Sequence, residues 1–199
     1  MLVGAVILAA GHSERMGRPK ALLEWEGDTF LGTIGRRLRR AGVSEVSVVL
    51  GRDAETILKG WRRANERVLI NRRPEDGQIS SLKLALRELA VDPAPEAVLV
   101  CLADTPLVRV ETYARLISAW AGSQGCLVVP RFNGKRGHPL VLDHRFWHET
   151  QLAPLEQGLH WVTHRHPESL RDVDVDDGGV TADIDTPGDY QKALSPAGR

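Results

Sequence analysis

The chain has 199 residues, 42% of them hydrophobic, which is enough to bury the core of one domain. Its 26 lysines and arginines balance its 26 aspartates and glutamates, so no overall charge favours a nucleic acid or an acidic membrane as partner. The two cysteines, Cys101 and Cys126, lie in apolar runs without metal-site spacing, so we expect buried free thiols in a cytoplasmic protein.

Segments typical of strands and helices alternate through the first half of the chain. The apolar run Val3–Leu8 predicts a buried first strand, because it lacks the basic start of a signal peptide and is too short to cross a membrane. Apolar side chains at helical spacing from Phe30 to Leu38 predict a helix that Gly42 ends. Further along, we expect a strand at Val46–Leu50, a helix from Asp53 to about Arg63, a strand at Val68–Ile70 and a helix after Asp76.

The second half adds two apolar strands, "AVLVCLAD" and "CLVVP", on either side of the amphipathic helix "RVETYARLISAW". After them, Asn133–Gly134 predicts a β-hairpin. The remaining expected elements are a helix from Leu152 until Pro167, a strand from Leu170 with Asp174, Asp176 and Asp177 solvated, and a last helix with Pro187 in its first turn and Asp185 or Thr186 as its cap.

This alternation predicts a single α/β domain of the Rossmann-like, three-layer α/β/α kind, with a mostly parallel sheet and a small β-hairpin lobe. We expect the domain to span residues 1–194 and residues 195–199 to form a loose tail. Ligands of such folds bind at the carboxyl edge of the sheet. The loop after the first strand and Asp104, which ends "VLVCLAD", should therefore lie at the ligand site.

The loop after the first strand has the composition of a phosphate-binding site. In "ILAAGHSERMGRPKALL", Gly11 and Gly17 let backbone amides approach an anion. Arg15 and Lys20 add positive charge for phosphate oxygens. The spacing matches neither the Walker A loop nor the dinucleotide fingerprint. On the residues alone, an ordinary glycine-rich turn with surface cations remains the alternative.

The segment "LAAGHSERMGRPK" resembles the signature loop of the MobA-like NTP transferases, which have the nucleotide-diphospho-sugar transferase fold. With "DGQISSL", "LADTP", "RGHPLVL" and "DIDTPGDY", the likeness to the molybdenum cofactor cytidylyltransferases extends from Gly4 to about Leu194. The related guanylyltransferases usually have "LAGG" and an Asp-Lys pair, so "LAAG" and Pro19–Lys20 favour CTP by resemblance.

The resemblance implies transfer of a nucleoside monophosphate from an NTP to the terminal phosphate of molybdopterin, with release of pyrophosphate and Mg²⁺ as cofactor. The implied catalytic residues are Arg15, Lys20 and Asp104. The implied nucleotide-binding residues are Leu8, Ala9, Ala10, Gly11, Arg15, Lys20, Gly77, Ser81 and Asp104. The implied metal ligands are Asp104 and Asp185, with Asp183 in reserve, and the implied acceptor residues are Gly137, His138 and Pro139.

Other interpretations stay open at this point. Asp104 can also form a turn, Asp185 and the serines after Gly77 can cap helices, and His138 can be a packed residue. His160, His164 and His166 belong to no motif, and "LEQGLHW" replaces a Gly-Asp-x-Gly-x-Arg stretch that the family often has. The alternatives in function are a guanylyltransferase, a sugar-phosphate or phospholactate nucleotidyltransferase, or a non-catalytic molybdenum cofactor chaperone. A target molybdoenzyme is a further expected partner.

Overall fold

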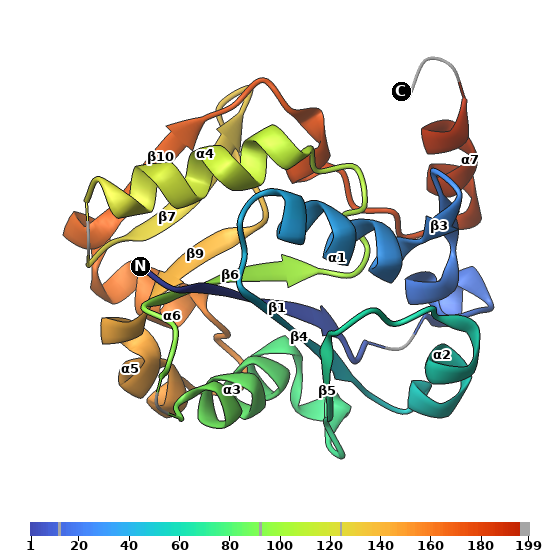
Figure 1. Cartoon of the computed structure of the whole chain (residues 1–199), viewed down its shortest axis with the longest axis horizontal. Helices are drawn as coiled ribbons and strands as arrows, with labels where there is room; N and C mark the ends of the chain where they lie inside the picture. The colour runs from blue at the N-terminus through green and yellow to red at the C-terminus, as the bar shows by residue number, and fades with distance from the viewer. Residues whose placement is uncertain (12, 92, 124, 196–199) are drawn as a thin grey trace.

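The computed structural model describes residues 1–11, 13–91, 93–123 and 125–195. The strands of the central sheet are β1 (Val3–Ala9), β4 (Glu45–Leu50), β5 (Arg67–Ile70), β6 (Ala97–Leu102), β7 (Leu127–Phe132), β8 (Lys135–Arg136), β9 (Leu140–Asp143) and β10 (Leu170–Asp174). Their order is β10-β7-β9-β6-β1-β4-β5, with β8 paired to β7 (Figure 1). The β1–β4, β1–β6, β4–β5 and β7–β10 pairs are parallel, while β9 runs antiparallel to β6 and β7.

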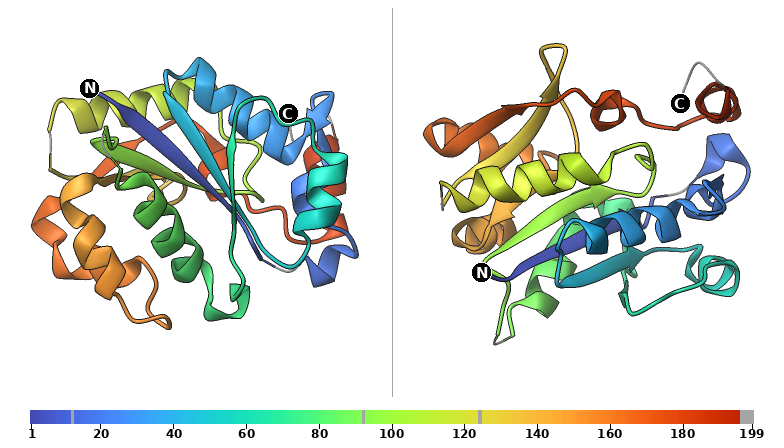
Figure 2. Two further views of the ribbon diagram at one scale, coloured as in Figure 1. Left: turned by 60° about the horizontal axis from the view of Figure 1, so that its bottom comes forward. Right: turned by 45° about the horizontal axis from the view of Figure 1, so that its top comes forward.

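Helices cover both faces of this sheet (Figure 2). The helices on one face are α1 (Phe30–Arg40) and α4 (Val110–Ala121), and those on the other are α3 (Gln78–Leu89), α5 (Trp147–Leu152) and α6 (His160–Arg165). Two further helices, α2 (Ala54–Gly60) and α7 (Pro187–Leu194), lie toward the side to which β1 and β6 point (Figure 1). The predicted three-layer α/β fold with a mostly parallel sheet is confirmed.

The position of β1 inside the sheet explains why its sequence is apolar throughout rather than alternating. Ala5 and Ile7 pack into the cluster formed with α1 and α4, whereas Val6 and Leu8 pack with α3 on the opposite face. Every residue of β1 is buried, as expected of a parallel strand covered on both sides. Full burial of each large apolar side chain stabilises the fold by roughly 1.5–3 kcal/mol. No helix in the described ranges is long and apolar enough to cross a bilayer.

Some predicted elements differ from the structure. The prediction of one helix from Leu152 to Pro167 is wrong, because α5 ends at Leu152 and α6 begins only at His160. Pro154 has no amide hydrogen to continue a helix, and Gly158 takes a left-handed φ of 59°. The helix after Asp53 ends at Gly60, since Trp61 is extended. A small hairpin of β2 (Glu24–Trp25) and β3 (Asp28–Thr29) was not expected, whereas the hairpin at Asn133–Gly134 joins β7 and β8 as predicted.

Asp177, expected to be solvated, is only 4% exposed. Its carboxylate accepts hydrogen bonds from the backbone amides of Arg109 and Gly179 and from the hydroxyl of Thr112, at 2.9, 3.0 and 2.5 Å. The acid therefore joins the start of α4 to the segment that follows β10. Two of its three partners, Arg109 and Thr112, lie 68 and 65 positions away in the chain, so the local sequence does not show its burial.

We expect Asp177→Ala to lower the free energy of unfolding by roughly 2–4 kcal/mol, because one part-buried and two buried hydrogen bonds lose their acceptor. Urea unfolding followed by circular dichroism measures the change. Asp176→Ala is the matched control, since Asp176 is the exposed neighbour and its loss should change stability by less than about 0.5 kcal/mol. Equal unfolding midpoints for the two variants would contradict the structural role of Asp177.

Candidate active site

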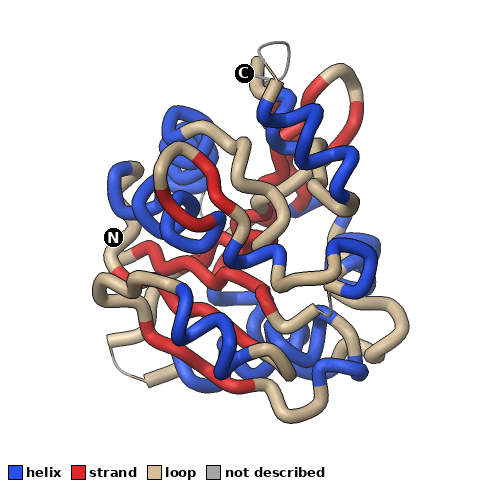
Figure 3. The backbone as a smooth tube through the Cα atoms, turned by 90° about the vertical axis from the view of Figure 1, so that its right-hand side faces the viewer, coloured by secondary structure: helices blue, strands red, loops and turns tan. Residues whose placement is uncertain are grey.

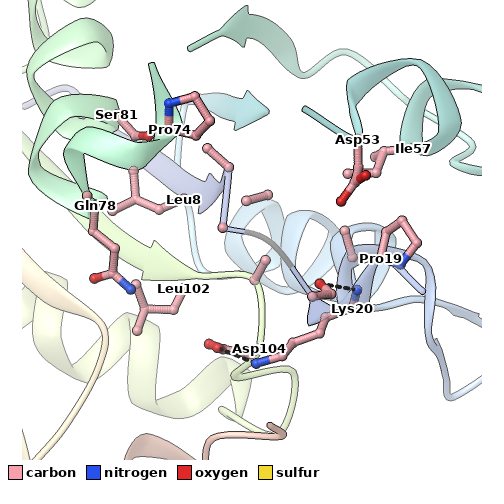
Figure 4. Close-up of a pocket in the computed structure, with 17 residues that line it drawn as sticks. Leu8, Pro19, Lys20, Asp53, Ile57, Pro74, Gln78, Ser81, Leu102 and Asp104 are labelled. Carbon is pink, nitrogen blue, oxygen red and sulfur yellow. Dashed lines mark hydrogen bonds and ion pairs between the residues drawn. The ribbon is translucent and has the colours of Figure 1, made fainter. Parts of the chain in front are cut away.

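The candidate site lies where β1 and β6 end. The two strands are parallel neighbours that pair Leu8 with Leu102, and the Ala103 amide donates to the Leu8 carbonyl at 3.1 Å. The glycine-rich loop and Asp104 therefore start side by side at the carboxyl edge of the sheet, which faces the viewer in Figure 3. A cavity of about 220 Å³ opens there (Figure 4). Of the predicted nucleotide-binding residues, it is lined by Leu8, Ala9, Ala10, Gly11, Lys20, Gly77, Ser81 and Asp104.

The glycine-rich loop folds around Ser13. The Ser13 carbonyl accepts from the amides of Met16 and Gly17, and its hydroxyl accepts from the Lys20 amide at 3.0 Å. Gly17 has a left-handed φ of 70°, which lets the chain turn back toward the cavity. These bonds hold the backbone of Lys20 at the rim of the site. His12 lies outside the described residues.

Gly51, directly after β4, allows the start of this loop to lie against its neighbour strand. A Cβ atom at Gly51 would come within 2.4 Å of the Ala10 carbonyl oxygen. We expect Gly51→Ala to displace Ala10 and to weaken nucleotide binding about tenfold or more, measured by calorimetric titration. Gly122→Ala is the control, because its added Cβ would meet nothing closer than 3.6 Å. Equal nucleotide affinity in the two variants would show that the close approach has no effect on the site.

The charged groups of the site converge on Lys20. Its ammonium donates to Asp104 Oδ2 at 3.2 Å and also to Asp185 Oδ1. Arg15 contacts the other oxygen of Asp185 at 3.0 Å, although the two residues are 170 positions apart. The side chains of Lys20 and Asp104 are 16% and 24% exposed, while that of Arg15 is 70% exposed. Arg15 therefore lies at the rim, and the lysine–carboxylate contact lies deeper.

The pKa of Asp185 is held below its ordinary value, chiefly by the hydrogen bond from Lys20 and also by Arg15. Asp185 does not cap α7. Thr186 does, by accepting from the Asp189 amide, while the Asp189 carboxylate accepts from the Thr186 amide. The Ile184 amide donates to the Asp104 carbonyl at 3.0 Å, so the extended segment before α7 is joined to the residues that follow β6. The carboxylates of Asp104 and Asp185 are thus both held next to the Lys20 ammonium.

The two carboxylates fit a divalent cation of the magnesium type. Asp104 Oδ1 is buried and has no hydrogen-bond partner, a state that a hard cation would relieve. Within the described part of the chain, no three His, Cys, Asp or Glu side chains form a group able to hold a metal. Mg²⁺ suits such a site, because it binds through one or two carboxylates and completes its shell with water and phosphate oxygens. Asp183, the reserve candidate, lines a different cavity, and partial burial and the charge of Asp104 raise its pKa.

The start of α3 forms the opposite wall of the cavity. Gly77 occupies the N-cap position, so neither of the following serines caps the helix. Instead the Asn71 amide donates to the hydroxyls of Ser80 and Ser81, at 2.8 and 2.9 Å. The side-chain oxygen Oδ1 of Asn71 accepts from the Arg73 backbone amide. Asn71 therefore connects the end of β5 to the part of α3 that lines the cavity.

Two of the three predicted acceptor residues line a second cavity of about 340 Å³, which shares Leu8, Gln78 and Leu102 with the first. Gly137 and His138 line it, but Pro139 is buried and does not. Burial lowers the pKa of His138, and its Nδ1 atom has no hydrogen-bond partner. The imidazole is therefore neutral near neutral pH and can offer an unused polar atom to a ligand.

The comparison with protein families agrees with this geometry. Residues 5–170 match the model of the MobA-like NTP transferase domain. The chain belongs to this family. The model describes an NTP transferase domain, and the match includes the glycine-rich loop, Asp104 and the predicted acceptor segment, while Asp185 lies beyond its end.

Three relatives of this MobA-like NTP transferase illustrate the range of the family. The chain is 33% identical over 151 residues, 71% of each chain, to the nicotine blue oxidoreductase of Paenarthrobacter nicotinovorans. It is 24% identical over 193 residues, 94% of this chain and 93% of the other, to the molybdenum cofactor cytidylyltransferase of Escherichia coli. The crystal structure of Rv0371c from Mycobacterium tuberculosis superposes with a TM-score of 0.84 at 29% identity over 97% of both chains. The same protein has been crystallised with manganese, and that complex superposes with a TM-score of 0.81 at 27% identity over 98% of both chains.

The sequence analysis missed three side chains, one that supports the wall of the first cavity and two that line the second. Asn71 follows β5 at the carboxyl edge of the sheet, and a polar residue directly after a strand is the signal that could have found it. His160 and His164, taken for residues without a role, both line the second cavity. Their spacing of four places them on one face of α6, but only the fold turns that face toward the site.

Proposed function

We propose that this protein is a Mg²⁺-dependent nucleotidyltransferase that transfers CMP from CTP to the terminal phosphate of a molybdopterin-type acceptor and releases pyrophosphate. The observation that carries the proposal is the meeting of Lys20, Asp104 and Asp185 beside the glycine-rich cavity. A likeness to the cytidylyltransferase over 94% of the chain supports the choice of CTP and acceptor. The manganese complex of a relative supports a divalent cation.

The chemistry is an in-line displacement at the α-phosphorus. An oxygen of the acceptor phosphate forms the new P–O bond, and the bond to the bridging oxygen breaks, so that pyrophosphate leaves with the electron pair. No general base is needed, because the acceptor phosphate is already ionised at neutral pH. The enzyme therefore has to position the two substrates and to balance their charge.

The residues divide these tasks between them. Asp104 and Asp185 would hold Mg²⁺, which supplies charge neutralisation for the phosphates when it is bound. Lys20 would leave the two carboxylates and turn its ammonium to the triphosphate, and Arg15 at the rim would neutralise the departing pyrophosphate. The backbone amides after β1 would bind phosphate oxygens. The wall formed by Gly77 and Ser81 would lie beside the base and ribose.

A nucleotide panel tests this proposal. The purified protein is incubated with Mg²⁺ and molybdopterin, each of the four NTPs is added in turn, and pyrophosphate release is measured. Release with CTP alone is the expected result. Release with GTP alone would keep the reaction and overturn the base specificity. No release with any NTP would overturn the proposal and favour a non-catalytic cofactor chaperone or a redox activity, as the name of the Paenarthrobacter relative suggests.

A further inference from the structure

The second cavity differs in chemistry from the nucleotide site beside it. Its walls are mostly apolar and come from the sheet and from α3, with Leu82, Val129 and Leu140 among them. Of the described residues that line it, none is acidic. Arg136 is the one lining arginine, and its guanidinium is committed to Asp172 by two hydrogen bonds, of 2.6 and 3.1 Å. The imidazoles of His138, His160 and His164 therefore supply much of the polar chemistry of the cavity, together with the side chains of Gln78 and Thr163.

Two of these imidazoles stand on α6, at the edge of the cavity. His160 and His164 are one turn apart, and their ring centroids are 5.5 Å from each other. Both side chains are exposed, and neither makes a hydrogen bond or ion pair with the described part of the chain. Their ring nitrogens are therefore available to a ligand that enters the cavity.

The helix that carries the pair is held in place. Arg165 donates to a Glu149 oxygen on α5 at 2.8 Å, and His166 contacts the other oxygen of the same carboxylate. The guanidinium of Arg165 also lies over the Trp161 ring, 4.7 Å from its centroid. The helix that carries the two histidines is consequently attached to α5 rather than free to move as a loop.

This combination of apolar walls and a polar edge selects among phosphorylated acceptors. A hexose phosphate would bury several hydroxyl groups against leucine and valine side chains without partners, which is costly. A flat heterocycle can pack its faces on those walls and turn its hydrogen-bonding edge to the imidazoles. A volume of about 340 Å³ falls within the range of small-ligand sites.

We propose that His160 and His164 are specificity-determining residues for the acceptor, because their imidazoles bind the hydrogen-bonding edge of the flat heterocycle that a molybdopterin-type phosphomonoester carries. The inference rests on the proposed function, since it concerns the second substrate of that reaction. The phosphate of the acceptor points past Leu8 and Leu102, which both cavities share, toward Asp104. The heterocycle stays under α6.

Direct binding tests the inference without turnover. Hydroxymethylpterin phosphate, followed by its own fluorescence, and glucose phosphate, followed by calorimetry, are titrated into the full chain and into the double variant His160→Ala/His164→Ala. We expect the pterin phosphate to bind the double variant about tenfold more weakly, because two hydrogen bonds are lost, and the glucose phosphate to bind both proteins equally weakly. The double variant His160→Gln/His164→Gln, which keeps hydrogen-bonding groups, should recover part of the affinity.

His148→Ala is the matched control, because His148 is an exposed histidine on α5 that does not line the cavity. Equal pterin-phosphate affinity in the wild type and the alanine double variant overturns the inference, as does a wild type that prefers glucose phosphate. The pyrophosphate assay separates this result from the proposed function. Histidine-dependent binding without pyrophosphate release refutes the reaction alone, and release with an unchanged KM for the acceptor in the double variant refutes the inference alone.

Discussion

Asp104→Asn abolishes turnover while the protein stays folded: we expect kcat to fall by about a thousandfold or more, which corresponds to the several kcal/mol that a bound divalent cation supplies. Asparagine keeps the size of the side chain but removes its negative charge. Oδ1 of Asp104 is the buried oxygen without a partner, and Oδ2 contacts Lys20. The backbone carbonyl of Asp104, which accepts from Ile184, is unchanged, so the segment that carries Asp185 stays attached.

Pyrophosphate release at saturating CTP and varied Mg²⁺ or Mn²⁺ measures the effect, and circular dichroism checks the fold. Asp174→Asn is the control, since Asp174, at the end of the edge strand β10, forms an exposed ion pair with Arg131 on β7. The interpretation fails if Asp104→Asn turns over at more than about a tenth of the wild-type rate, because a lost metal ligand costs far more. A variant that is inactive because it unfolds would instead make Asp104 a structural residue.

Lys20→Ala separates the role of the lysine in the free protein from its role with nucleotide. In the free protein its ammonium lies between Asp104 and Asp185, where a cation would bind. We therefore expect the variant to bind Mn²⁺ in the absence of nucleotide at least as tightly as the wild type. With nucleotide, the loss of a phosphate contact should raise the KM for CTP by about tenfold to a hundredfold.

Manganese titration followed by electron paramagnetic resonance, together with steady-state kinetics, measures both effects. Lys59→Ala is the matched control, because Lys59 pairs with Glu55 on the exposed face of α2 and is 75% exposed. A variant that loses Mn²⁺ binding would mean that Lys20 orders the carboxylates rather than competing for them. An unchanged KM for CTP would remove Lys20 from the nucleotide site.

The sequence predicted correctly those elements that a few neighbouring residues determine. The strand β1 and the turn at Asn133–Gly134 were predicted correctly. A continuous apolar run is the local sign of a strand buried on both faces, and Asn-Gly is the local sign of a turn with left-handed φ angles. The same reasoning failed from Leu152 to Pro167, where the apolar pattern continues but Pro154 interrupts the helix. It also failed for Asp177, whose burial depends on partners in another segment.

The sequence by itself determined the alternation of strands and helices in the first half of the chain, the chemical groups of the glycine-rich loop and the position of Asp104 at the end of a buried strand. These features follow from side-chain periodicity and turn chemistry, which neighbouring residues set. Only the tertiary structure decided that Thr186, and not Asp185, caps α7, so that Asp185 meets Lys20 from 165 positions away. It also placed the histidines of α6 at the second cavity, because spacing along one helix defines a face but not what that face meets.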